Sequence, residues 1–258
     1  MDISKMKAVY QIGLNTFRET IRSHVVYLVV LFTAILILLS VSFGEWSVFA
    51  RAQVIEDFGL AAMSISGLLL AIFIGVGLLG REISSKTVYH VLAKPVSRSS
   101  FITGKFAGLL AVLVLIYIIM AVFFMATLAI MGGHVNCLIV SAIICIWMET
   151  AIIISASIFF STFASPVLAA VFSTAFYIAG HLNDLVSVHV SAKSGIFPVI
   201  QKIIYYLIPN LEHFNIRDHV VYNIVLPGGY MEMAVSYGCL YVILFITLGC
   251  VIFEKKDL

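Results

Sequence analysis

A single acidic residue, Glu149, interrupts a long uncharged stretch and is the first candidate for chemistry in this sequence. An ionisable group at the centre of a membrane span costs on the order of 2.5–3.5 kcal/mol on insertion scales unless it is paired, protonated or facing a wet cavity. On a helix, Glu149 shares a face with residues that are mostly small, namely Ala142, Cys145, Ile152 and Ala156. Two roles are open: a lining residue of a transport path or gate, or a structural carboxylate that is protonated or bonded to a neighbouring span. The sequence names no partner for it.

Histidines and acidic residues gather in the last third of the chain, a mixture that can bind metals. They are His181, His189, His213, His219, Asp184, Glu212 and Asp218. Their spacings match no standard ligand pattern, and Glu212–His213 lacks the second histidine of a metalloprotease helix. We therefore expect solvated or interfacial histidines and no metal site. The four cysteines lie in apolar segments without CxxC spacing, which indicates buried thiols.

Nucleotide chemistry has no support in the sequence. No GxxxxGK[ST] phosphate-binding loop occurs. A GxGxxG string does occur at Gly75, Gly77 and Gly80, but it lies inside an apolar segment, where glycines permit close helix packing. We predict that the chain is not an enzyme, carries no cofactor of its own and binds no nucleic acid.

The composition places these residues in a membrane protein. The chain is 62% hydrophobic and 11% charged, with a mean hydropathy of +1.12, whereas soluble domains carry about 25% charged residues. Uncharged runs longer than the roughly 18 residues of a membrane span recur, and backbone groups in lipid must be satisfied within a helix. We predict one all-α transmembrane domain, residues 1–258, with six spans. These are Val25–Gly44, Phe58–Gly80, Phe106–Met131, Cys137–Phe163, Pro166 to about Leu185, and Met233–Phe253.

The distribution of basic residues predicts the orientation. With the N-terminus inside, eleven of the 15 lysines and arginines fall on the cytoplasmic side. Because basic residues concentrate in cytoplasmic loops, both termini are expected in the cytoplasm, with the chain in the inner (cytoplasmic) membrane. The N-terminus lacks an early apolar core and a small-residue cleavage site, so no cleavable signal peptide is expected.

Three segments outside the spans have recognisable character. Apolar residues recur at three- and four-residue steps within residues 1–22, which predicts an amphipathic helix along the inner membrane face. The stretch 81–104 is polar and basic and lies between two long apolar spans. The outer loop, residues 186–232, holds apolar runs too short to cross a bilayer, which favours short helices in the outer interface or re-entering it.

The order of these features resembles a known family. The amphipathic segment FRETIRSHVVYLVVLF enters the first span, GREISSKTVYHVLAKPVSRSSFITGKFAG follows the second, and FEKKDL ends the chain. The pattern is strongest in the order of Glu82, Thr87, Lys94–Pro95, Ser97–Arg98 and Gly104–Lys105. Together these residues resemble the membrane subunit of a type-2 ABC exporter, the ABC-2 permease family, over essentially the whole chain.

The resemblance implies a function and partners. Such permeases carry a short cytoplasmic coupling helix, here about Arg81 to Arg98, that docks on a separately encoded ATPase subunit. They also carry re-entrant helices before the last span, and they act in pairs of identical or related chains. ATP and magnesium would then act through the partner ATPase. The residues implied in ATPase coupling are Arg81, Glu82, Lys86, Thr87, Lys94, Pro95 and Arg98.

Two other functions remain open. An intramembrane enzyme, such as a lipid-modifying transferase, could use Glu149 and the outer histidines, although no paired catalytic groups stand at a recognisable spacing. A non-transporting membrane anchor could instead receive mechanical work from the ATPase. An ordinary positive-inside loop is the simpler alternative to a coupling segment at 81–104.

Overall fold

The computed structural model describes residues 3–47, 50–84, 97–133, 135–183 and 208–255. Every regular element within these ranges is a helix, so the predicted all-α class is confirmed. Five helices are long and apolar enough to cross a membrane. They are α2 (His24–Trp46), α3 (Arg51–Ser84), α5 (Arg98–Ile130), α6 (Cys137–Phe163) and α11 (Tyr230–Lys255).

The surface of these helices is apolar. Leu28 on α2, Val122 on α5 and Leu240 on α11 are each more than 60% exposed, and exposed leucine, isoleucine, valine and phenylalanine side chains recur along all five. Such a surface is stable against lipid chains rather than water. The chain is therefore a multi-pass membrane protein.

The predicted fifth span is shorter than expected. Helix α7 (Pro166–His181) begins at the predicted proline, with Ser165 at its N-cap position, but it has only 16 residues. At 1.5 Å per residue it extends about 24 Å, less than the roughly 30 Å hydrocarbon core. The six-span count is thus not confirmed: the described part of the chain holds five long candidate spans and this shorter apolar helix.

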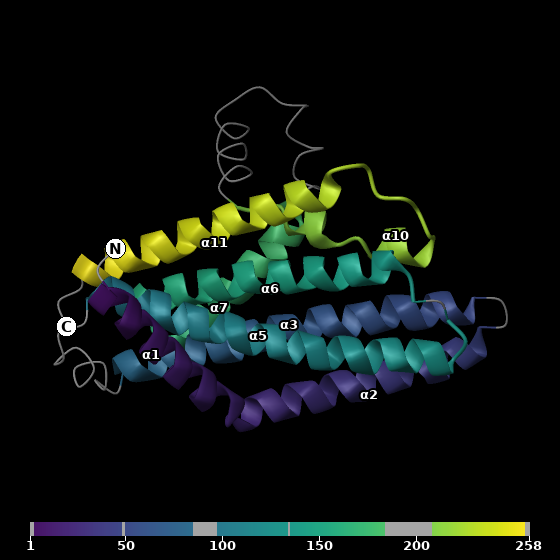
Figure 1. The fold of residues 1–258 in the computed structure, drawn as a ribbon, viewed down its shortest axis with the longest axis horizontal. Helices are drawn as coiled ribbons and strands as arrows, with labels where there is room; N and C mark the ends of the chain where they lie inside the picture. The colour runs from purple at the N-terminus through teal and green to yellow at the C-terminus, as the bar shows by residue number, and fades with distance from the viewer. Residues whose placement is uncertain (1–2, 48–49, 85–96, 134, 184–207, 256–258) are drawn as a thin grey trace.

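Helix α6 occupies the centre of the bundle. It packs against α3, α5, α7 and α11, while α2 packs mainly on α3. In Figure 1, α1 begins and α11 ends at the same end of the bundle, and α10 lies near the opposite end. We call these the inner and the outer end, because the predicted orientation places both termini in the cytoplasm.

Three further elements, one helix of 19 residues and two short ones, complete the described structure. Helix α1 (Ile3–Ile21) occupies the predicted N-terminal amphipathic segment and crosses α5 obliquely (Figure 1). The 3₁₀ helix η1 (Leu211–Phe214) and helix α10 (Arg217–Val221) fall within the predicted outer loop 186–232 and pack on α6, with further contacts to α7 and α3. We refer to η1 and α10 together as the outer cap.

Glycines allow α3 to approach its neighbours closely. A Cβ atom at Gly59 would overlap the ring of Phe124 on α5, and one at Gly75 would lie 3.0 Å from the Cβ atom of Ser157 on α6. Gly75 belongs to the GxGxxG string, so at this glycine the string serves helix packing, as the sequence suggested.

Candidate functional site

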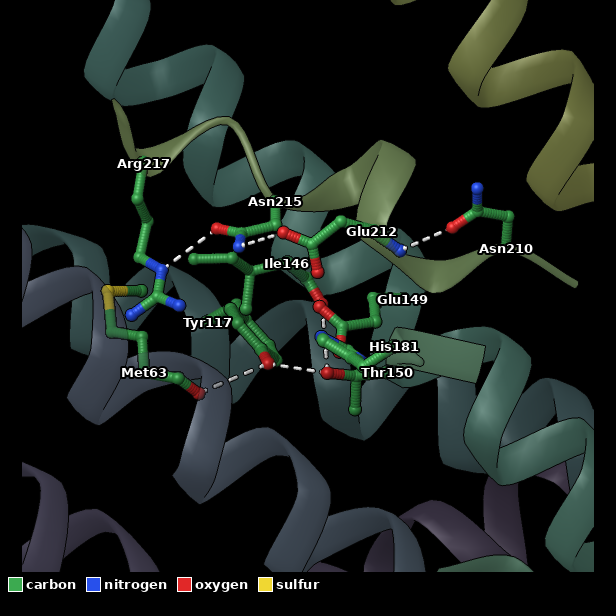
Figure 2. A network of polar contacts seen from close by, with 10 residues as sticks. All are labelled: Met63, Tyr117, Ile146, Glu149, Thr150, His181, Asn210, Glu212, Asn215 and Arg217. Atoms are coloured by element: carbon green, nitrogen blue, oxygen red, sulfur yellow. Dashed lines mark hydrogen bonds and ion pairs between the residues drawn. The ribbon is translucent and has the colours of Figure 1, made fainter. Parts of the chain in front are cut away.

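A buried group of polar side chains lies between α3, α5, α6 and α7, next to the outer cap (Figure 2). Glu149 is a fully buried member of this group. It is the thirteenth of the 27 residues of α6, which places it about 18 Å along the helix from Cys137. The residue is only 3% exposed, and the small residues that share its helical face are buried with it, as expected.

His181 supplies the partner that the sequence did not name. Its Nε2 atom lies 3.6 Å from Oε1 of Glu149, within ion-pair distance. His181 is the last residue of α7, and its ring packs on Tyr177 with centroids 4.5 Å apart. Among the described residues, neither Oε1 of Glu149 nor Nδ1 of His181 has a hydrogen-bond partner. His181 is therefore a partly buried member of this site, not the solvated or interfacial histidine that was expected.

A second polar contact joins three long helices beside Glu149. The Tyr117 hydroxyl on α5 lies 2.6 Å from Oγ1 of Thr150 on α6 and 3.5 Å from the Met63 carbonyl on α3. Thr150 also donates to the Ile146 carbonyl at 2.9 Å. A Cβ atom on Gly67 of α3 would overlap both hydroxyl oxygens, so the three helices meet here at close range.

The outer cap is held by its own chain of hydrogen bonds. Asn210 accepts from the Glu212 backbone N–H at 3.0 Å and so caps η1. Asn215 donates to Oε1 of Glu212 at 2.6 Å, and the Arg217 Nε–H donates to Oδ1 of Asn215 at 2.9 Å. Nη1 of Arg217 lies 3.9 Å from the Asp57 carboxylate, which links α10 to α3. The cap is thus a small ordered unit that Arg217 joins to α3.

Two apolar side chains anchor the cap to the helices below it. Leu211 and Phe214 are at most 1% exposed. Leu211 fills the space left by Gly180 on α7, and Phe214 lies against Gly238 on α11. Beside His181, the Asn183 amide donates to the Ile208 carbonyl at 3.0 Å. The end of α7 is therefore tied directly to the segment that leads into the cap.

The Gly180–Leu211 contact gives a testable prediction. A Cβ atom at Gly180 would lie 2.6 Å from Cδ1 of Leu211, which has no room to move. Gly180→Ala should therefore loosen the cap by about 1–3 kcal/mol, the usual range for overpacking. Amide hydrogen exchange of residues 211–221 should become faster.

Two further variants identify the cause of that change. Combining Gly180→Ala with Leu211→Ala removes the clash and should recover part of the protection. Gly228→Ala is the control, since a Cβ atom there meets nothing within 4 Å. Equal exchange in Gly180→Ala and Gly228→Ala would contradict the assigned contact.

The chemistry available to this site is limited. Asp57, Glu149 and Glu212 are acidic. Arg217 is a cation close to them, and His181 is a titratable base. Within the described ranges no three histidine, cysteine or acidic side chains are grouped to hold a metal ion. Of the histidines and acids grouped by sequence, His189 and Asp184 lie outside the described residues. The arrangement can hold a proton between Glu149 and His181 and can position the cap.

Of the residues expected to couple to an ATPase, those that the structure describes lie at the inner end. Lys86, Thr87, Lys94 and Pro95 are outside the described residues, and Arg81 and Glu82 lie in the last turns of α3, whose backbone alone is described there. Arg98 is described and begins α5, directly after the N-cap residue Ser97.

Arg98 joins the start of α5 to the end of α11. Its Nη1 donates to the carbonyls of Phe253 and Glu254, both at 3.2 Å. A cation at the C-terminus of a helix satisfies carbonyls that lack intrahelical donors and complements the helix dipole. The Phe101 and Phe253 rings stack beside it with centroids 6.0 Å apart. The last predicted coupling residue is thus built into the helix bundle.

Helix α1 meets α5 through glycines on both helices. A Cβ atom at Gly104 would lie 3.0 Å from the Val9 carbonyl oxygen, and one at Gly108 would lie 2.5 Å from the Gly13 carbonyl oxygen. The GKFAG sequence therefore provides a small-residue surface that accepts the backbone of α1. Between these glycines lies the buried Lys105, whose Nζ stands 5.5 Å above the Phe101 ring.

Sequence comparison agrees with this architecture. The profile of the family described as "ABC-2 family transporter protein" matches residues 15–258, which takes in the described spans, the outer cap and the C-terminal part of α1. No curated protein matches the chain significantly. With a match over almost its full length and a bundle of apolar helices, the chain belongs to the ABC-2 family of transporter membrane proteins.

Proposed function

We propose that this chain is the membrane subunit of an ATP-driven exporter in the inner (cytoplasmic) membrane, with both termini in the cytoplasm. It works as a pair of permease chains, identical or related, above two separate ATPase subunits. The observation that carries the proposal is the family match over residues 15–258 in a chain without a phosphate-binding loop. ATP and magnesium act on the partner, and this chain supplies the path through the bilayer.

In this proposal, movement of the docking segment at the inner end reaches the bundle through α3 and through α5. Residues 81–98 dock on the ATPase, and both flanks of that segment continue into long helices, α3 and α5. Arg98 and Phe101 connect the start of α5 to the end of α11, while Gly104 and Gly108 connect it to α1. A displacement of the docking segment therefore moves α3, α5, α11 and α1 together.

At the outer end, Glu149 belongs to the gate of the path. The cap rests on α6 and α7 beside it and is tied to α3 through Arg217 and Asp57. Since α3 and α11 run from the inner end to the cap, a shift of these helices would change how the cap sits. ATP binding is in this way converted into opening of the outer exit.

Arg98→Ala tests the inner part of the proposal. Loss of the guanidinium removes a donor from two carbonyls at the end of α11. In the assembled complex, the stimulation of ATPase activity by the permease should therefore fall several-fold. The chain should still insert, because the apolar helices are unchanged. Glu82→Ala should act in the same direction through the docking segment. Unchanged ATPase stimulation in both variants would remove the coupling assignment.

Arg51→Ala is the matched control. Arg51 lies at the outer end, half exposed, with Glu45 at 3.3 Å, and its removal should leave ATPase stimulation intact. Purification of the chain from its membrane in mild detergent supplies the partner test. A stoichiometric ATPase subunit supports the permease function, whereas a chain that purifies alone even after crosslinking favours the enzyme or the non-transporting anchor.

A further inference from the structure

We propose that Glu149 and His181 form a binding site for a single proton, and that this proton holds the outer cap against α6 and α7. The proposal goes beyond transport, because it concerns the chain itself and can be tested without ATP or cargo. Figure 2 shows the two side chains facing each other beneath the cap.

The burial of the pair requires the proton. The Glu149 side chain is 4% exposed, and its Oε1 atom has no hydrogen-bond donor among the described residues. An ionised carboxylate in such a place is strongly destabilised unless a counter-charge compensates it. One proton removes this destabilisation whichever residue carries it. On Glu149 it gives a neutral acid beside imidazole, and on His181 it gives a carboxylate beside imidazolium. With no proton, a bare charge would remain buried.

The surrounding charges do not replace that proton. Arg217 is directed to Asp57 and Asn215, and Glu212 adds a further negative charge. The titratable and charged groups that surround the pair, taken from the described part of each packed element, are Asp57 of α3, Tyr117 of α5, Cys145 of α6, Tyr177 of α7, Glu212 and His213 of η1, Arg217 of α10, and Tyr230 and Tyr237 of α11. Arg217 is the one full positive charge in this set, against three carboxylates with Glu149 included.

His181 connects the proton to the cap. It is 24% exposed, so the imidazole is the member of the pair that reaches the surface and exchanges the proton. Gly180, the residue before His181, packs against Leu211 of η1. Asn183, two residues after His181, donates a hydrogen bond to the Ile208 carbonyl. Loss of the proton removes the attraction between His181 and Glu149. The end of α7 can then move, and the cap moves with it.

The sign of the pH dependence follows from linkage. The closed cap binds the proton more tightly than the open cap, so raising the pH favours opening. In the pH range in which closing takes up one proton, the open population rises by up to about tenfold per pH unit. Lowering the pH through the same range closes the cap.

Amide hydrogen exchange of residues 211–221, measured on the full chain in lipid nanodiscs over a series of pH values, tests this directly. After correction for intrinsic exchange rates, the wild-type cap should exchange faster as pH rises. Glu149→Gln keeps the shape of the neutral acid and should give a cap whose corrected exchange does not depend on pH. Infrared spectra of Glu149→Gln and the wild type show where the proton resides. If it is on Glu149, the variant should lack one protonated-carboxyl band of the wild type; if it is on His181, the variant should lack one carboxylate band.

Two histidine variants complete the design. His181→Gln leaves the carboxyl group without imidazole. The closed cap still buries the neutral acid, so a pH response should remain but move to a different pH range, which also covers the case in which Glu149→Gln does not fold. His213→Gln changes an exposed cap histidine and should keep the wild-type response. A pH-independent wild-type cap overturns the proposal, as does a wild-type pH response in Glu149→Gln or a response in His181→Gln that stays in the wild-type pH range.

Discussion

Replacing Gly67 by alanine should destabilise the bundle strongly. The added Cβ atom would overlap the hydroxyl oxygens of Tyr117 and Thr150 at once. Tyr117 is 3% exposed and Thr150 2%, so neither can move aside. Overpacking costs about 1–3 kcal/mol, and loss of the hydrogen bond between the two hydroxyls adds roughly 1 kcal/mol. We expect a lower yield of monodisperse protein and a melting temperature lower by several degrees.

Two comparisons separate this clash from a general effect of mutation. Ile65→Phe adds a comparable volume, but on the exposed face of the same helix, and should melt close to the wild type. Gly67→Ala combined with Tyr117→Phe and Thr150→Ala removes both obstructing oxygens and should recover part of the loss. A Gly67→Ala chain that melts with the Ile65→Phe control would show that α3, α5 and α6 do not meet as closely as the structure places them.

The long helices could be predicted from the sequence because length and hydropathy determine them. The first, third, fourth and last predicted spans correspond to α2, α5, α6 and α11, and the Phe163–Pro166 hairpin lies where the proline indicated. Their ends were harder to place. Helix α3 runs to Ser84, beyond the predicted Gly80, and α5 begins at Arg98, before the predicted Phe106. A helix continues past the membrane when polar residues can be solvated, so charge marks the end of the apolar region and not the end of the helix.

The candidate site could be predicted only in part. A carboxylate in an apolar span indicates a special site, and Glu149 does belong to the buried polar group. Its partner His181 lies 32 positions later, and no helical spacing relates residues on separate helices. Tyr117, Thr150 and Arg217 were equally hidden, since each is common in membrane proteins and becomes informative only when packing unites α3, α5, α6 and the cap. The family resemblance indicates Arg98 as a coupling residue, whereas its contacts with α11 depend on the fold.

Replacing Gly108 by alanine should detach α1 from the bundle. The added Cβ atom would lie 2.5 Å from the Gly13 carbonyl oxygen and 2.8 Å from Cβ of Thr16. Because the first obstacle is backbone, relief requires the whole of α1 to shift. Overpacking costs about 1–3 kcal/mol. Because α1 contacts the bundle chiefly through α5, this cost weakens the docking of α1 and not the packing of the other helices. Trypsin should therefore cleave after the exposed Arg22 several-fold faster, while the melting of the remaining helices changes little.

The functional consequence distinguishes a mechanical α1 from a passive one. If α1 carries movement from the inner end, as proposed, Gly108→Ala should reduce permease-stimulated ATPase activity together with α1 docking. Ala126→Val adds volume on an exposed face of the same helix and should change neither cleavage nor ATPase stimulation. Faster cleavage with full stimulation would mean that α1 docks without transmitting force, and coupling would then run through Arg98 and α11. Wild-type cleavage in Gly108→Ala would instead contradict the close crossing of α1 and α5, because the Gly13 carbonyl leaves no space for a side chain at that position.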